Sequence, residues 1–197
     1  AGTISDKPVN IEINYLPLWD TKKGALSTYL CLAKNDTETD NYFEAQQKLY
    51  EDKDRGTITS TDITILRSVG KELAEMAKDG RKFFIACPVH HETVYHMDNF
   101  EAYKKALSDM PLEHRKYLLL FVMNDKDTQP PKNSYWFAKP LRTLCPHIFA
   151  DIPLRRDINF NYLHEASVDV AGVRLNKDSM SEQEAIPLLN ALSAKAK

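Results

Sequence analysis

Glycine is scarce in this sequence, with six residues in 197. None of the six stands in a G-x-G-x-x-G or G-x-x-x-x-G-K-[ST] pattern, the loops whose backbone amides bind nucleotide phosphates. The sequence therefore argues against the common folds of dehydrogenases, kinases and ATPases.

Long apolar runs and an excess of one charge are also missing. No run approaches the roughly 20 residues that span a bilayer, and the amino end has no signal-peptide pattern. The formal net charge is −2, which gives no electrostatic reason to expect nucleic acid or an anionic membrane as partner. We therefore expect a cytoplasmic protein that binds neither.

The three cysteines, Cys31, Cys87 and Cys145, lie far apart, each beside or within an apolar segment, and form no C-x-x-C pair. Such spacing is typical of buried thiols in a reducing compartment.

The amino end predicts a β-hairpin. Residues 1–8 are polar and indicate a linker, whereas apolar residues alternate with polar ones from Val9 to Tyr15, which predicts a strand. A second strand is expected over 26–33, and the short link favours a hairpin. Residues 9–197 show no internal boundary and are expected to form a single domain.

The rest of the chain alternates between helical and strand patterns. Nearly continuous apolar strands separated by helices indicate a parallel sheet covered on both faces, so the fold class is α/β. Helices are predicted over 41–52, 60–80, 97–110, 134–145, 158–166 and 181–197, and strands over 81–87, 116–124, 147–152 and 168–175.

Several residues mark helix ends. Gly80 is expected to end the long second helix, Pro140 to strain its own helix, and Pro187 is an alternative first-turn residue of the last helix. The expected amino-terminal caps are Ser60 or Thr61, Asp98 with Glu101, and Ser181 with Glu184.

The stretch 87–96, "CPVHHETVYH", is close to the zinc-binding pattern H-E-x-x-H but does not match it. After His91, the next histidine is His96, five residues on and about 140° round a helix. The geometry favours solvated loop histidines just beyond a strand, with a metal site completed from elsewhere as the alternative.

Two strings resemble EAL domains, the bacterial cyclic-di-GMP phosphodiesterases. The first spans 13–33, "INYLPLWDTKKGALSTYLCLA", and the second 168–176, "VDVAGVRLN". The matching residues are Tyr15, Pro17, Leu18 and Asp20 in the first and Val168, Asp169 and Val170 in the second.

The resemblance implies a TIM-barrel-like fold that begins with a β-hairpin. A full (β/α) barrel usually takes about 250 residues. We therefore expect a modified or incomplete barrel, truncated relative to eight strands, whose open edge would favour a homodimer.

The departures from the family fall on its expected ligands. A glutamine, a glutamate, an arginine, an asparagine and a lysine are replaced, in that order, by Leu16, Thr28, Leu32, Ala86 or Cys87, and Gly172. The segment 116–124 holds no acid where the family has a second glutamate, and of two paired aspartates only Asp151 remains. Hard cations need several anionic oxygens, and one aspartate does not supply them.

Polar residues follow several predicted strands, where barrel enzymes keep their chemistry. The functional interpretation is a polar rim at the barrel mouth, and the alternative is turn and cap residues. The residues are Asp20, Asp125, Asp127, Asp151 and Asn176.

The aromatic residues Tyr135, Trp136 and Phe137 are a candidate interaction patch, because Trp and Tyr are enriched at interface hot spots. Packing of their helix on the sheet is the alternative.

Together these patterns predict a catalytically inactive EAL-like regulatory or protein-interaction domain of a bacterial signalling protein. It needs no cofactor, and its partner is another protein or a neighbouring domain. The alternative is a metal-dependent, phosphodiesterase-like hydrolase rebuilt around Asp151, Asp125 and the His90/His91 pair.

Overall fold

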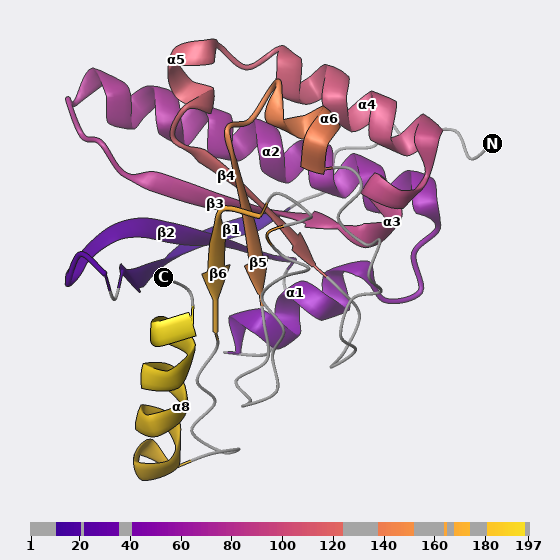
Figure 1. Ribbon diagram of the computed structural model, residues 1–197. Coiled ribbons are helices and arrows are strands. Elements are labelled where there is room, and N and C mark those ends of the chain that lie inside the picture. The colour runs from indigo at the N-terminus through magenta and orange to yellow at the C-terminus, as the bar shows by residue number, and fades with distance from the viewer. Residues whose placement is uncertain are drawn as a thin grey trace.

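The computed structural model describes residues 11–20, 22–35, 41–123, 138–151, 164, 168–173 and 181–195. Within them one six-stranded sheet runs in the order β1-β2-β3-β4-β5-β6 (Figure 1). The strands are β1 (Glu12–Asp20), β2 (Ala25–Lys34), β3 (Phe84–His90), β4 (Leu118–Met123), β5 (His147–Asp151) and β6 (Val170–Gly172). The helices are α1 (Tyr42–Tyr50), α2 (Arg55–Lys78), α3 (His91–Tyr95), α4 (Met97–Ser108), α5 (Leu112–Arg115), α6 (Ala138–Arg142) and α8 (Glu182–Lys195).

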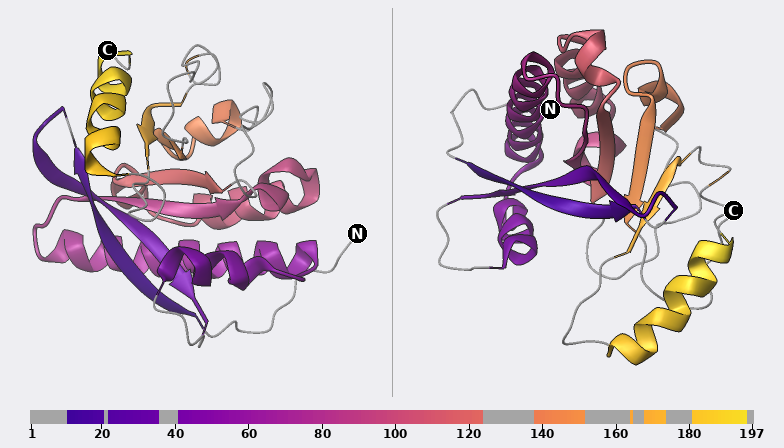
Figure 2. Two further views of the ribbon diagram at one scale, coloured as in Figure 1. Left: turned by 90° about the horizontal axis from the view of Figure 1, so that it is seen from below. Right: turned by 90° about the vertical axis from the view of Figure 1, so that its left-hand side faces the viewer.

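The sheet is a curled half-barrel. β1 pairs antiparallel with β2, and every later neighbour pair is parallel. The helices α2 and α4 cover the outer side of the curl, and α1 lies on the other side of the sheet from them (Figures 1 and 2). The expected α/β class, the incomplete barrel and the opening hairpin are therefore confirmed.

The hairpin turn depends on Asp20 and Gly24. One carboxylate oxygen of Asp20 accepts the backbone N–H groups of Lys22 and Lys23, each at 3.0 Å. Gly24 has φ +60°, a left-handed conformation that glycine adopts without strain. Because β1 runs opposite to the other strands, Asp20 lies at their amino ends. Its expected place at the barrel mouth is therefore wrong.

Alternation along the strands divides the core in two. Odd-numbered residues of β2 and β3, such as Cys31, Cys87 and Val89, face α2 and α4 in the large outer cluster. The smaller cluster, on what we call the inner face, consists of Leu30, Leu32, Ala86, Leu119, Phe121 and Phe149.

The second helix begins earlier than predicted. Asp54 is its N-cap and accepts the N–H of Thr57 at 3.1 Å. Ser60 and Thr61 therefore lie inside α2, buried, where their hydroxyls donate to carbonyls four residues back. Their expected capping role is wrong, whereas Gly80, with φ +70°, follows the end of the helix as predicted.

Two other cap predictions have opposite outcomes. The N-cap of α4 is His96, so Asp98 is already in the helix and its expected capping box with Glu101 is wrong. At α8 the Glu184 carboxylate accepts the backbone N–H of Ser181 at 3.0 Å, as predicted.

Several predicted boundaries change or lie outside the described residues. Pro187 is inside α8, which excludes the first-turn alternative. The helix expected over 134–145 is represented by α6, which covers 138–142. Residues 134–137 of the predicted helix lie outside the described part. The helix expected over 158–166 falls outside it except for residue 164.

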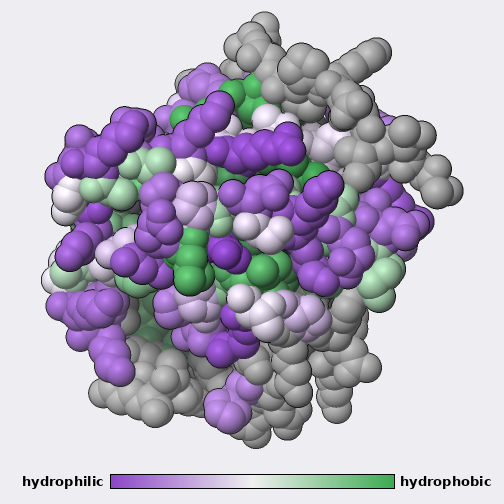
Figure 3. Space-filling view, turned by 90° about the horizontal axis from the view of Figure 1, so that it is seen from above, coloured by the Kyte–Doolittle hydropathy of each residue, from purple (hydrophilic) through white to green (hydrophobic). Residues whose placement is uncertain are grey.

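The outer face of the helix layer is mostly hydrophilic, with smaller hydrophobic areas between (Figure 3). Across the described ranges, no helix combines the length and the apolar character that a membrane span requires.

Candidate functional site at the barrel mouth

The carboxyl ends of the parallel strands meet at one edge of a barrel, where the loops that follow them form the mouth. Three predicted rim residues, Asp125, Asp127 and Asn176, lie outside the described residues, as does the aromatic patch 135–137. Asp151 is the last residue of β5, and its backbone pairs with Gly172 of β6. Of the residues predicted to form the polar rim, Asp151 is therefore the one that the described part of the chain places at this edge.

Apolar side chains fill the inner face behind this mouth. Leu32, where the resemblance expects an arginine, is buried in the inner cluster. Thr28, where it expects a glutamate, pairs with Phe84 at the start of β3, toward the amino ends of the strands. The rings of Phe121 and Phe149 pack edge to face, 5.2 Å apart.

Gly172 stands where the resemblance expects a lysine, and the space beside it is occupied. A Cβ atom at this position would lie 2.4 Å from Cζ of Phe149 and 2.9 Å from Cε2. Any side chain at 172 would therefore collide with the ring unless Phe149 moved.

His90 is part of the fold rather than of a solvated loop. It is the last residue of β3 and only 9% exposed. Its Nδ1 accepts the backbone N–H of Glu92 at 3.2 Å and so caps α3, and its ring stacks on Tyr50 at 4.8 Å. The strand predicted over 81–87 continues to His90, since Pro88 lies inside β3 opposite Phe121. The loop interpretation of His90 is therefore wrong.

A buried carboxylate that sequence reasoning missed lies beneath His90. Asp62, on α2, is fully buried and accepts the Tyr50 hydroxyl at 2.6 Å and the His90 backbone N–H at 2.9 Å. Burial raises the pKa of Asp62 from 3.8 to about 7, although its hydrogen bonds act in the opposite direction. An acid on the apolar face of a helix, between Ile58 and Leu66, is the signal that could have revealed it.

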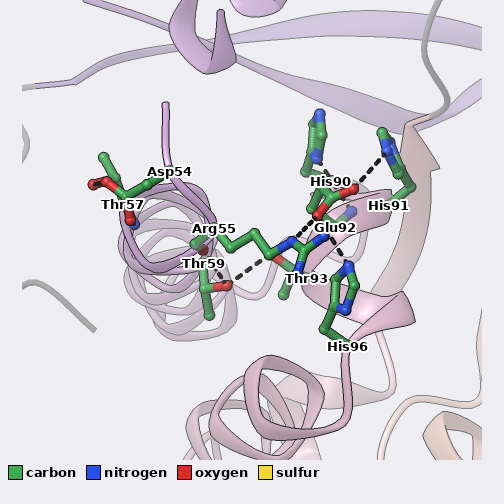
Figure 4. Close-up of polar contacts among 9 residues, drawn as sticks. All are labelled: Asp54, Arg55, Thr57, Thr59, His90, His91, Glu92, Thr93 and His96. Atoms are coloured by element: carbon green, nitrogen blue, oxygen red, sulfur yellow. Dashed lines mark hydrogen bonds and ion pairs between the residues drawn. The ribbon is translucent and has the colours of Figure 1, made fainter. Parts of the chain in front are cut away.

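Glu92 is the centre of a second polar cluster, on α3 (Figure 4). Its carboxylate accepts Arg55 Nε at 2.7 Å and lies 3.0 Å from His96 Nε2 and 3.4 Å from His91 Nε2. Partial burial acts to raise the pKa of Glu92, but the hydrogen bond from Arg55 and the neighbouring cations outweigh it, so the pKa is lowered. This carboxylate joins the start of α2 to the junction between α3 and α4.

Neither cluster has the geometry of a metal centre. The described ranges contain no group of three or more His, Cys, Asp or Glu side chains placed to hold a metal ion. The Glu92 carboxylate is paired with Arg55. The imidazoles of His91 and His96 both contact that carboxylate and do not surround an open position.

Asp169, one of the residues that match the EAL pattern, has a structural role. Its carboxylate accepts the backbone N–H of Ile148 at 2.9 Å and pairs with Arg142. Because Asp169 precedes β6 and Ile148 lies at the start of β5, this contact is at the amino ends of the strands, where barrel residues serve stability.

No protein-family model and no curated protein matches the chain. Solved structures do. The chain is similar to an EAL domain protein from Listeria monocytogenes EGD-e, with TM-score 0.64 and 11% identity over 94% of this chain and 73% of that one. It is also similar to the phosphodiesterase PaMucR in complex with c-di-GMP, with TM-score 0.66 and 16% identity over 93% and 79% of the two chains.

A third similar structure is the S helix-GGDEF-EAL portion of Vibrio cholerae LapD bound to c-di-GMP, with TM-score 0.63 and 12% identity. The match covers 94% of this chain and 44% of that one. In that protein, as its name says, the EAL domain shares a polypeptide with an S helix and a GGDEF domain.

The chain therefore has the fold of EAL domains, as an incomplete barrel. This confirms the resemblance that the two strings indicated. Identities of 11–16% establish the fold and leave the activity to be argued from the residues.

Proposed function

We propose that this chain is a catalytically inactive EAL-like domain that serves as a regulatory or protein-interaction module in a bacterial cytoplasmic signalling protein. The observation that supports it is the apolar inner face. Leu30 and Leu32 of β2, Phe121 of β4 and Phe149 of β5 occupy the positions that point into the half-barrel.

A divalent cation would find few ligands on this face. Mg²⁺ and Ca²⁺ take six or more oxygen ligands, mainly carboxylates, carbonyls and water. In a two-metal hydrolysis, carboxylates hold the ions that generate hydroxide and stabilise the leaving oxygen. Phe149 and Phe121 offer no oxygen, and the ring of Phe149 fills the space beside Gly172.

A rebuilt hydrolase around Asp151, Asp125 and the His90/His91 pair is the less favoured alternative. His90 is buried, and its Nδ1 already accepts a backbone N–H. For such a site, a second histidine and both aspartates would have to converge on this buried ring.

The regulatory role is supported by how such domains occur. The LapD structure joins an EAL domain to a GGDEF domain and an S helix in one chain. A domain that lacks catalytic residues but keeps the fold can still transmit a signal through contacts with a neighbouring domain or a separate protein.

Turnover of cyclic-di-GMP is the direct test. The protein is incubated with the dinucleotide and Mg²⁺ or Mn²⁺, and linear product is followed by chromatography, with an active EAL phosphodiesterase as the positive control. We expect no product and no thermal shift on adding either metal. Metal-dependent hydrolysis that disappears in Asp151→Ala would overturn the proposal and favour the hydrolase.

A further inference from the structure

The side of the half-barrel opposite the mouth carries a surface that the site does not use. The hairpin turn, the start of β3 and the segment from α5 to β4 all lie on this side. These parts lie toward the left in Figure 1 and face the viewer in the right-hand view of Figure 2. We call this surface the amino-end face.

Apolar side chains are exposed on the hairpin part of this face. Trp19 and Leu26 are paired across β1 and β2 and are 63% and 47% exposed. Tyr29 continues the strip on β2, and its ring contacts Phe83 edge to face at 5.4 Å. An exposed tryptophan in an apolar strip is a common feature of protein interaction sites.

Cations border this strip. A hollow of about 200 Å³ between the end of α2 and α5 is lined by Arg81, Lys82, His114 and Lys116, together with Glu113 and Tyr117. Lys82 precedes Phe83 of the strip directly, and Lys22 and Lys23 lie in the hairpin turn. The hollow is therefore next to the strip.

The charge of the face is opposite in sign to that of the chain. The turn and the lining of the hollow hold the five cations Lys22, Lys23, Arg81, Lys82 and Lys116 and the two carboxylates Asp20 and Glu113. A third carboxylate, Asp79, pairs with Arg81. The pairs Lys23 with Asp20 and Arg81 with Asp79 are exposed, so water screens them. The face therefore has an excess of positive charge on a chain of net charge −2.

We propose that the amino-end face binds an acidic protein segment that carries aromatic or aliphatic side chains. The apolar side chains would cover Trp19 and Leu26, and the carboxylates would pair with Lys22, Lys82 and Lys116. Complementary charge also guides such encounters and selects among partners. This inference rests on the proposed role as an interaction module and names the surface and the partner class.

The same charges disfavour a second copy of this chain as the occupant. In a symmetric homodimer the same patch meets itself, so cations of one copy, such as Lys82 and Lys116, would meet cations of the other.

The test uses the full chain and fluorescently labelled peptides. One peptide alternates Glu or Asp with Trp and Leu, and a second replaces each acid by Lys. Binding is followed by anisotropy at low and high salt. We expect the acidic peptide to bind, to weaken as salt rises, and to bind about tenfold more tightly than the basic one.

Matched variants locate the contact. Trp19→Ala and Lys82→Glu are each expected to weaken binding of the acidic peptide about tenfold. Met97→Ala, at a position 61% exposed on α4, and Lys71→Glu, on the exposed side of α2, are expected to leave it unchanged. Thermal unfolding of each variant checks that the fold is intact.

Three outcomes would overturn the inference: equal binding of the basic peptide, equal effects of the control variants, or absence of binding. Preferential binding of single-stranded DNA or of phosphatidylserine vesicles at the same residues would overturn it too. Turnover of cyclic-di-GMP together with peptide binding would refute the proposed function and leave the face standing. Absence of both turnover and peptide binding would leave the proposed function standing and refute the binding role of the amino-end face.

Discussion

Asp62 shows how one residue holds three elements together. From the middle of α2 its carboxylate reaches the hydroxyl of Tyr50, at the end of α1, and the backbone of His90, at the end of β3. Thr93 of α3 hydrogen-bonds the same carboxylate. A buried acid without such partners would cost several kcal/mol, so these contacts are what make burial tolerable.

The ionisation of Asp62 predicts how stability depends on pH. Its pKa in the fold is about 7, above 3.8 for the free side chain, so the folded state keeps a proton that the unfolded state loses. As pH rises from about 4 to 7, the contribution of Asp62 to the free energy of unfolding should therefore fall. We expect the wild type to lose stability relative to Asp62→Asn across this range.

The Asn variant is the matched reference because it resembles the protonated acid and does not titrate. Denaturant unfolding of both proteins at pH 5 and pH 8 measures the difference directly. A difference that stays constant between the two pH values would show that Asp62 is ionised throughout.

At the scale of elements, β5 and β6 fit together because one of them carries glycine. Gly172 pairs with Asp151, and the ring of Phe149 lies over the position of its missing side chain. The close fit belongs to the inner face, so it decides both the packing there and the lack of room for a side chain at position 172.

Gly172→Ala is therefore expected to lower the free energy of unfolding by about 1–3 kcal/mol, because the new methyl group overlaps the Phe149 ring. Denaturant titration measures the loss. Adding Phe149→Leu, which removes the ring, should return part of the lost stability. A Gly172→Ala protein as stable as the parent would show that the ring moves away freely.

At the scale of the whole molecule, the three thiols report on the core. Cys31, Cys87 and Cys145 are all free and buried. Burial raises the pKa of Cys31 to about 12 and that of Cys145 to about 11, so almost no thiolate is present at neutral pH.

All three thiols should therefore be unreactive toward a disulfide reagent in the native protein and react fully in denaturant. The number of thiols modified over time, read from the absorbance of the released reagent, checks this. A thiol that reacts in buffer as fast as in denaturant would show that its part of the core opens locally.

The hairpin, the alternation of helices and parallel strands, and the EAL resemblance could all be predicted from the amino-acid sequence. These features follow from local patterns. The spacing of apolar residues between Val9 and Tyr15, or along α2, can be read from a few consecutive residues. The end of α2 at Gly80 was local too, because a left-handed glycine stops a helix without help from the rest of the fold.

The arrangement of the site could not be predicted in this way, because it depends on the three-dimensional fold. The fold moved Asp20 to the amino ends of the strands, since β1 runs antiparallel to β2. It also joined Asp62 to His90, 28 residues on, and placed Phe149 against Gly172. Such contacts depend on the curl of the sheet and on which side chains share its inner face, and no spacing along the chain encodes them.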